Sequence, residues 1–413
     1  MKNKELIYIK TISIFIISIC FLSFTTKAAE DMVVKLGIDN IDENIDIFRD
    51  KKVGLITNPS GIDSNFMSTI DILNRKTNLT TLFSVEHGIR GNISAGDNIR
   101  DEIDVITGLP VYSLYGKNKK PTSNMLNNID ILAYDIQDVG ARFYTYINTL
   151  AYAMEACAKN NKTFVVFDRP NPLGGNQVQG IYLNKDYSSL VGKYPIVQRY
   201  GLTIGEYANF INKEFKINCD LKVISMTNWS RDMYYDETNL KTWVMPSPNI
   251  PTLDSALAYI GTCLFEGTNV SEGRGTTKPF EIIGAPWINS LNFANDLNNL
   301  NLTGVKFRPI SFKPTSSKYS KDDGVLNDKE CGGVQIHITD RKTVNPVKIG
   351  VAMVITLKNK YKNEFKFTSN NFIDNLYGDK SLREDQKSIE EFFKIIDRES
   401  ELFKKQIKKY YIY

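Results

Sequence analysis

The sequence predicts an α/β fold in which helices cover both faces of a mostly parallel sheet, followed by a second domain. Six short apolar segments in the first half alternate with helical patterns, which is typical of a parallel sheet. The segments are continuously apolar, which indicates burial on both faces. The chain has 413 residues, more than one hydrophobic core usually serves, so two domains are expected.

The predicted elements of the first domain follow one another in a regular order. Strands are expected at 52–57, 80–85, 109–114, 130–135, 163–168 and 221–226. Gly108 and Pro110 place the third of these at a sheet edge or at a strand start. Helices are expected from Asp63 or Ser64 to residue 74, from 143 to 154, and from 203 to 214, where Thr203 and Glu206 have the spacing of a capping box.

The character of the sequence changes near Met245, where a proline-rich segment at 245–252 begins. Beyond it, helices are expected at 253–265, capped by Thr252 or Asp254, and at 347–358 and 386–395. Strands are expected at 305–312 and 333–339. We therefore predict a first domain at 29–245 and a second at 246–413.

The first 28 residues have the pattern of a Sec signal peptide. Lys2, Lys4 and Lys10 precede an apolar run at 11–24, and 26–28 is a plausible cleavage site. The alternative is an uncleaved anchor, although the run is short for a membrane span. We predict a secreted or cell-envelope protein that meets the membrane only through an uncleaved signal segment. Cleavage would lower the net charge from +4 to about +1, so nucleic acid is not an expected partner.

Several classes of site are excluded by what the sequence lacks. It contains no G-x-G-x-x-G, no G-x-x-x-x-G-K-[ST] and no G-x-S-x-G motif, so a nucleotide cofactor or a serine nucleophile is not expected. Two histidines and widely spaced cysteines do not give the usual spacing of a zinc site. Cys157 and Cys263 lie in apolar helical contexts and are expected to be buried. We predict no cofactor and no metal.

Three predicted strands end in charged loops, after Val85, Asp135 and Asp168. Since parallel strands point the same way, these loops should share one rim of the sheet. Paired carboxylates suit glycosidic bond cleavage, and arginines in such loops suit an anionic substrate. Each charged group has a structural alternative: Asp168 could pair with Arg169, Asp135 and Asp138 could cap a helix, and Glu272 could pair with Arg274. The carboxylates of these loops are Glu86, Asp135, Asp138, Asp168, Glu266 and Glu272, and the arginines are Arg90, Arg142, Arg169 and Arg274.

Five motifs in this order give the sequence a resemblance to a known family. They are I-T-N-P-S-G at 56–61, E-H-G-I-R-G at 86–91, D-I-Q-D-V-G-A-R at 135–142, D-R-P-N-P-L-G-G at 168–175 and E-G-T-N-V-S-E-G-R-G-T at 266–276. Together they resemble the NamZ-type exo-β-N-acetylmuramidases, glycoside hydrolase family 171. The resemblance implies a Rossmann-like domain joined to a smaller C-terminal α/β domain, with the active site in the cleft between them. It also implies release of terminal β-1,4-linked N-acetylmuramic acid from the non-reducing end of peptidoglycan fragments.

The resemblance also assigns roles to residues. Glu86 is expected to be the general acid, His87 to orient it or contact the sugar, and Asp138 or Asp135 to be the second group, with Glu272 as a further candidate. Substrate binding is expected from Asn58, Arg90, Asp135, Arg142, Arg169, Glu272 and Arg274. The alternative is a non-catalytic protein that binds muropeptides, which would have the same cleft and arginines but would need no proton donor.

Overall fold

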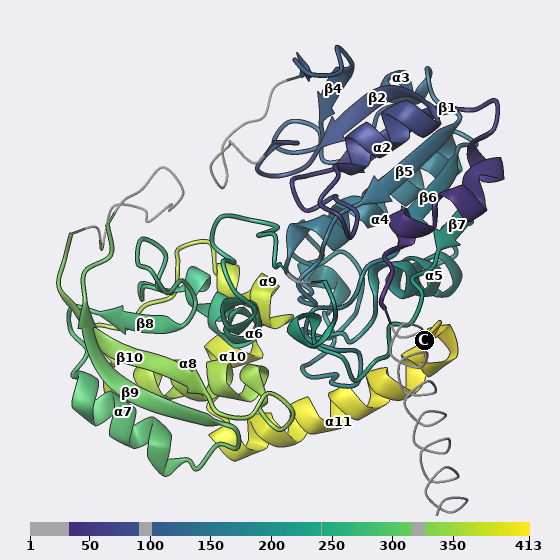
Figure 1. Ribbon diagram of the computed structural model, residues 1–413. Coiled ribbons are helices and arrows are strands. Elements are labelled where there is room, and N and C mark those ends of the chain that lie inside the picture. The colour runs from purple at the N-terminus through teal and green to yellow at the C-terminus, as the bar shows by residue number, and fades with distance from the viewer. Residues whose placement is uncertain (1–32, 91–100, 241, 316–325, 327) are drawn as a thin grey trace, which may run out of the picture.

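The computed structural model describes residues 33–413 except 91–100, 241, 316–325 and 327 (Figure 1). The predicted signal peptide at 1–28 therefore lies outside the described residues.

A seven-stranded sheet organises the first half of the chain, with the strand order β3-β4-β2-β1-β5-β6-β7. Its strands are β1 (Lys52–Thr57), β2 (Asn78–Ser84), β3 (Glu102–Ile103), β4 (Pro110–Ser113), β5 (Ile131–Asp135), β6 (Thr163–Phe167) and β7 (Leu221–Ile224). All neighbouring pairs are parallel except β3–β4. Counted along the chain, the parallel strands have the order 3-2-1-4-5-6 of dinucleotide-binding sheets. The predicted Rossmann-like, mostly parallel sheet is confirmed.

Helices cover both faces of this sheet. Successive residues of a strand point to opposite sides, so each strand packs against both layers. Ile56 of β1 belongs to one hydrophobic cluster, which includes residues of α4 (Thr145–Lys159) and α5 (Ile204–Glu214). Val53 and Leu55 belong to another, with residues of α2 (Thr69–Lys76) and of the 3₁₀ helices η1 (Gly37–Asn40) and η2 (Asp42–Phe48). The continuously apolar strands are thus explained by burial on two sides.

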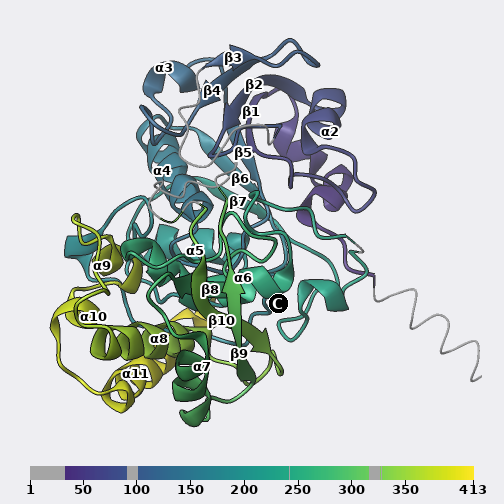
Figure 2. The same cartoon turned by 90° about the vertical axis from the view of Figure 1, so that its left-hand side faces the viewer.

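The second half of the chain forms a three-stranded antiparallel sheet with the order β8-β10-β9. Its strands are β8 (Ile282–Ala285), β9 (Val305–Phe312) and β10 (Cys331–Ile338). The helices are α6 (Leu253–Thr262), α7 (Ser290–Asn299), α8 (Pro346–Lys360), α9 (Phe372–Tyr377), α10 (Ser381–Glu384) and α11 (Ile389–Ile407). In both views α6 lies on the side that faces the first sheet (Figures 1 and 2).

Two glycines fix the position of α6 against α8. A Cβ atom on Gly261 would lie 1.9 Å from the carbonyl oxygen of Pro346, and one on Gly350 would lie 2.2 Å from that of Gly261. Only glycine permits so close an approach of two helix backbones. The crossing therefore determines where the carboxyl end of α6 and the 3₁₀ helix η5 (Cys263–Gly267) are held.

Three expectations about individual elements need correction. The helix expected from Asp63 or Ser64 begins at Thr69 with Ser68 as its N-cap, because Asp63 instead accepts hydrogen bonds from the backbone of Asn65 and Met67 in a turn. The helix expected at 386–395 continues to Ile407. Strand β8 was not predicted, since its four residues include a glycine and give no clear period.

The chain ends on the first sheet rather than within the second region. The Tyr413 hydroxyl donates to Asp168 at 2.7 Å, and the backbone of Ile412 donates to Glu206 at 2.8 Å. Asp168 follows β6, so the C-terminal segment joins the two regions. Across the described residues, no helix is both long and apolar enough to span a bilayer.

Candidate active site

A cavity of about 220 Å³ lies between the two sheets, outside the carboxyl ends of β2 and β5. These strands flank β1, where the strand order reverses, and ligands of open α/β sheets bind at that point. One wall comes from the loops after β2 and β5, and the opposite wall comes from α6, η5 and the segment that follows. The lining includes Glu86, His87, Tyr115, Tyr144, Thr145, Tyr146, Ser247, Asn249, Tyr259, Cys263, Glu266, Arg274 and Phe280.

Glu86 and His87 lie in a tight turn directly after β2. The backbone N–H of Gly88 donates to the carbonyl of Val85 at 3.0 Å, and His87, the third residue of this turn, has φ +74°. A side chain other than glycine is strained at such a position, and strain of this kind collects at functional sites. The Glu86 carboxylate accepts a hydrogen bond from the Thr145 hydroxyl at 2.9 Å. The turn therefore presents a half-buried carboxylate to the cavity.

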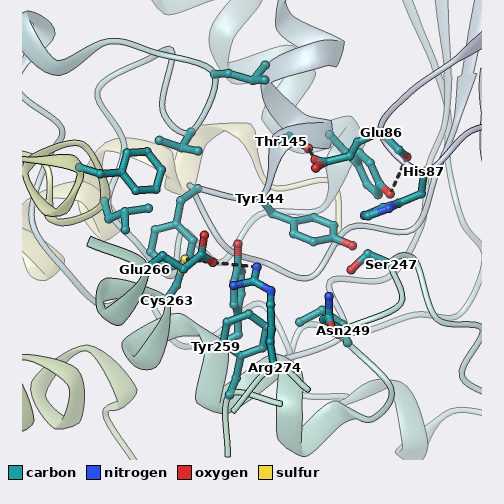
Figure 3. A pocket seen from close by; sticks show the side chains of 18 of the residues that line it. Glu86, His87, Tyr144, Thr145, Ser247, Asn249, Tyr259, Cys263, Glu266 and Arg274 are labelled. Carbon is teal, nitrogen blue, oxygen red and sulfur yellow. Dashed lines mark hydrogen bonds and ion pairs between the residues drawn. The ribbon is translucent and has the colours of Figure 1, made fainter. Parts of the chain in front are cut away.

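Glu266 and Arg274 form the opposite wall (Figure 3). Arg274 pairs with Glu266 at 2.9 Å and with Glu272 at 2.7 Å, and its guanidinium lies 4.8 Å from the centre of the Phe280 ring. Burial alone would lower the pKa of Arg274, but the two carboxylates raise it. Among the described residues that line the cavity, Arg274 is the only arginine or lysine.

Tyr144 lies between the two ends of the cavity (Figure 3). Its ring packs edge-on against the rings of Tyr146 and Tyr259, and the ring centres lie 4.8 Å and 6.0 Å away. Its hydroxyl points towards Ser247 but makes no hydrogen bond within the described residues. Burial raises the pKa of Tyr144, so the hydroxyl stays protonated and can act as a hydrogen-bond donor.

Known proteins match almost the whole described chain. Two family models, described as exo-β-N-acetylmuramidase NamZ, N-terminal and C-terminal, match residues 53–254 and 257–413. The chain belongs to the NamZ family. It is 48% identical over 393 residues to the peptidoglycan β-N-acetylmuramidase NamZ of Bacillus subtilis strain 168, covering 94% of this chain and 93% of that protein.

Solved structures show the same fold as this NamZ family member. A DUF1343 family protein of Bacteroides fragilis NCTC 9343 matches with a TM-score of 0.85 and 38% identity, and covers 92% of this chain and 99% of its own. A second such protein of that strain has a TM-score of 0.74 and 32% identity, with the same coverage.

Of the predicted catalytic and substrate-binding residues, the cavity brings together Glu86, His87 and Arg274. Glu272 is half-buried behind Arg274 and is held by it, so its part in the site is indirect. Arg90 lines a neighbouring cavity, where it pairs with Asp104 at 3.0 Å. These placements divide the predicted site residues into those that face the cavity and those that support it.

Asp135 and Arg169 form a buried ion pair, so the structure does not support substrate binding by either. Arg169 donates to Asp135 at 2.9 Å and to the carbonyl of Ile62 at 2.6 Å. Asp135 also accepts from Thr69, and both charged side chains are almost fully buried. The expected pairing of Asp168 with the Arg169 side chain is also wrong, because Asp168 accepts from the backbone of Arg169.

Arg142 is fully buried, which rules against the predicted contact with substrate. Its guanidinium donates to four backbone carbonyls, those of Ile181, Ile196, Leu376 and Tyr377. Burial lowers the pKa of Arg142 to about 9, so the side chain remains charged at neutral pH. Its role is to join the loops around 181 and 196 to the end of α9.

Asn58 is a positioning residue rather than a ligand of the substrate. It is buried, and its amide donates to the carbonyl of Pro246 at 3.1 Å. The Tyr146 hydroxyl donates to the same carbonyl at 2.7 Å. Together they hold the proline-rich segment, which carries Ser247 and Asn249 into the cavity.

Asp138, the predicted second catalytic group, is buried and is not among the residues that line the cavity. One carboxyl oxygen accepts from the Tyr200 hydroxyl and the backbone of Gly140, and the other has no partner among the described residues. Burial raises the pKa of Asp138 to about 6, although these hydrogen bonds lower it.

Replacement of Asp138 by asparagine is expected to change the pH dependence of stability rather than catalysis. The folded carboxyl keeps its proton to a higher pH than the unfolded chain, so the unfolding free energy of the wild type falls between about pH 4 and pH 6. The total fall due to this group is on the order of 3 kcal/mol, and the variant should lack it. Urea unfolding at pH 4 and pH 7 measures most of this fall in unfolding free energy. An equal pH dependence in both proteins would contradict the assignment, and a stable but inactive variant would return Asp138 to the catalytic residues.

The sequence did not single out Tyr144, Thr145, Ser247 or Asn249 as site residues. Tyr144 and Thr145 follow the D-I-Q-D-V-G-A-R motif at 135–142 almost directly. Ser247 and Asn249 lie in the proline-rich segment at 245–252, for which the sequence predicts only a change of domain. Glu266 was among the candidate carboxylates but was not chosen, because its nearness to Glu86 depends on the packing of α6. Within the described ranges, no cluster of three or more His, Cys, Asp or Glu side chains could hold a metal ion.

Proposed function

We propose that the protein is an exo-β-N-acetylmuramidase that releases N-acetylmuramic acid from the non-reducing end of peptidoglycan fragments, with Glu86 as the proton donor. The observation that carries this proposal is the Glu86 carboxylate, which a turn after β2 presents at one end of the cavity between the two sheets. Cleavage of a glycosidic bond needs an acid at the leaving oxygen. The Thr145 hydroxyl holds one carboxyl oxygen, and the other is left to carry the proton.

The size of the cavity supports an exo mode of action. Pockets for drug-sized ligands are about 300–1,000 Å³, and this cavity of about 220 Å³ is suited to a single sugar unit. Tyr144, Tyr259 and Phe280 provide aromatic surface for that sugar. Arg274 is the cation in reach of the lactyl carboxylate that distinguishes muramic acid, since a guanidinium matches a carboxylate well.

The second carboxylate of the reaction is proposed to be Glu266. Of the described lining residues, only Glu86 and Glu266 carry carboxylates. They lie on opposite sides of the cavity (Figure 3), as the acid and its partner do in glycosidases. Arg274 holds Glu266 in place at 2.9 Å. Glu266 therefore replaces Asp138 as the candidate for this role.

A secreted or cell-envelope location is part of the same proposal. The basic residues and apolar run at 1–28 support export, and export would bring the enzyme to its peptidoglycan substrate. The protein would contact the membrane only through this segment, and only if the segment stays uncleaved.

Digestion of defined fragments tests the proposed function. Fragments that begin with N-acetylmuramic acid and matched fragments that begin with N-acetylglucosamine are incubated with the protein and followed by mass spectrometry. Loss of one terminal N-acetylmuramic acid from the first set alone is expected. No product from either set would indicate a muropeptide-binding protein, and released peptide or acyl groups would indicate an amide or ester hydrolase.

Replacement of Tyr144 by phenylalanine is expected to slow the enzyme without weakening the fold. The lost hydroxyl has no hydrogen-bond partner among the described residues, so its removal should leave the melting temperature unchanged or higher. A hydrogen bond to substrate is worth about 1 kcal/mol, so kcat/KM should fall about fivefold. Tyr207→Phe is the matched control, because its buried hydroxyl also lacks a partner but lies outside the cavity lining. Equal kcat/KM values for Tyr144→Phe and wild type would remove this hydroxyl from the site.

A further inference from the structure

A second cavity, of about 430 Å³, adjoins the first. Its described lining is Pro59, His87, Arg90, Val244, Met245, Pro246, Ser247 and Pro248. His87 and Ser247 line both cavities. The two are therefore neighbours that share a wall, and a ligand longer than one sugar could extend from one into the other.

The shared wall lies at the end of the first cavity where the proton donor is. His87 and Ser247 are seen beside Glu86 and Tyr144, whereas Glu266 and Arg274 lie on the far side (Figure 3). In the proposed reaction, the acid must touch the oxygen that joins the terminal sugar to the rest of the substrate. The part of the substrate beyond that oxygen must then lie past the Glu86 end, which is where the second cavity begins.

The lining of the second cavity suits a neutral sugar. Proline, valine and methionine side chains give an apolar surface for the C–H face of a ring or for an acetamido methyl group. Arg90 is the one charged side chain in this described lining. Its Nε and Nη2 atoms donate to Asp104 at 3.0 to 3.2 Å, and the Asp104 carboxylate also accepts from Thr107 at 2.7 Å. The guanidinium is thus held in one orientation. Among the described residues Nη1 makes no hydrogen bond, which leaves it to a hydroxyl or carbonyl of a ligand.

We propose that this second cavity binds the leaving saccharide, a neutral amino sugar, while the first cavity holds the terminal muramic acid. The inference rests on the proposed function, because it takes Glu86 as the acid. It adds that the enzyme recognises a sugar on both sides of the bond that it breaks, with Met245 and Arg90 as the residues that distinguish a sugar from a smaller leaving group.

Two substrates with the same terminal sugar distinguish a change in this second cavity from a change in the catalytic one. One is the disaccharide of N-acetylmuramic acid and N-acetylglucosamine, and the other is the muramic acid glycosyl fluoride, whose leaving group is too small to reach the second cavity. For Met245→Ala and Arg90→Lys, the ratio of kcat/KM for the disaccharide to that for the fluoride is expected to fall about tenfold. Inhibition by free N-acetylglucosamine should weaken in both variants.

Matched controls exist for both changes. Met67 is 39% exposed and Met245 49%, and the paired side chains of Arg341 and Arg90 are 33% and 34% exposed. Met67→Ala and Arg341→Lys should leave the ratio unchanged. Met245 is about half exposed, so Met245→Ala should leave the fold intact. This variant therefore tests the second site even if Arg90→Lys lowers the melting temperature. An unchanged ratio in Met245→Ala would overturn the second site while the proposed function stands, whereas a wild-type protein that cleaves neither substrate would overturn both.

Discussion

Glu86→Gln is expected to lower kcat/KM for release of N-acetylmuramic acid by about 10²–10⁴-fold, with a melting temperature near that of the wild type. The amide keeps an oxygen that can accept from the Thr145 hydroxyl, but it cannot donate a proton to the leaving oxygen. Steady-state kinetics with the disaccharide substrate and thermal unfolding of both proteins measure the two quantities.

Glu214→Gln is the matched control for this change. Its carboxylate is also partly exposed and accepts from a hydroxyl, that of Tyr410 at 2.6 Å, but it lies outside the cavity lining. It should retain wild-type activity. If Glu86→Gln retained more than a few per cent of the activity, Glu86 would not be the acid.

Arg169→Met should produce the largest loss of stability among the predicted site residues. The change leaves the Asp135 carboxylate buried without its cation, and loss of one partner of a buried ion pair costs about 3–5 kcal/mol. Equilibrium unfolding in urea at pH 7 measures the difference in unfolding free energy.

Arg341→Met provides the contrast, because Arg341 pairs with the carboxylates of Asp236 and Asp254 but is partly exposed. Its loss should cost less than about 1 kcal/mol. A variant at Arg169 that is as stable as wild type but binds the disaccharide poorly would show that Arg169 contacts substrate after all.

The parallel sheet could be predicted because its physical cause is local. Strands buried on both faces must be apolar throughout, and β1, β5 and β6 show this directly in the sequence. The turn after β2 could also be predicted, since an apolar run ends abruptly at Glu86 and His87. The rule that parallel strands share a carboxyl rim then placed these residues near a site.

Which charged side chains face the cavity could not be predicted in the same way. Arg142, Arg169 and Arg274 all lie in loops that contain glycine, proline or acidic residues close by, so they look alike in the sequence. Their surroundings in the fold differ because of long-range packing. Arg142 donates to the carbonyl of Tyr377, far along the chain, whereas Arg274 lines the cavity. A sequence pattern contains no information on these distances, so it does not distinguish buried structural arginines from ligands of the substrate.

The opposite wall depends on packing as well. Glu266 faces the cavity because Gly261 and Gly350 allow α6 to approach α8 closely. Neither glycine stands out in a helical pattern, where it only weakens the prediction of a helix. The pairing of Glu86 with Glu266 across one cavity is therefore a result of the structure.

A crystal structure of Glu86→Gln with the uncleaved disaccharide tests the central claim most directly. The muramic acid ring is expected in the cavity between Tyr144 and Arg274, with the glycosidic oxygen about 2.6–3.2 Å from the side chain of residue 86. A disaccharide bound elsewhere, or one whose glycosidic oxygen lies far from residue 86, would contradict it.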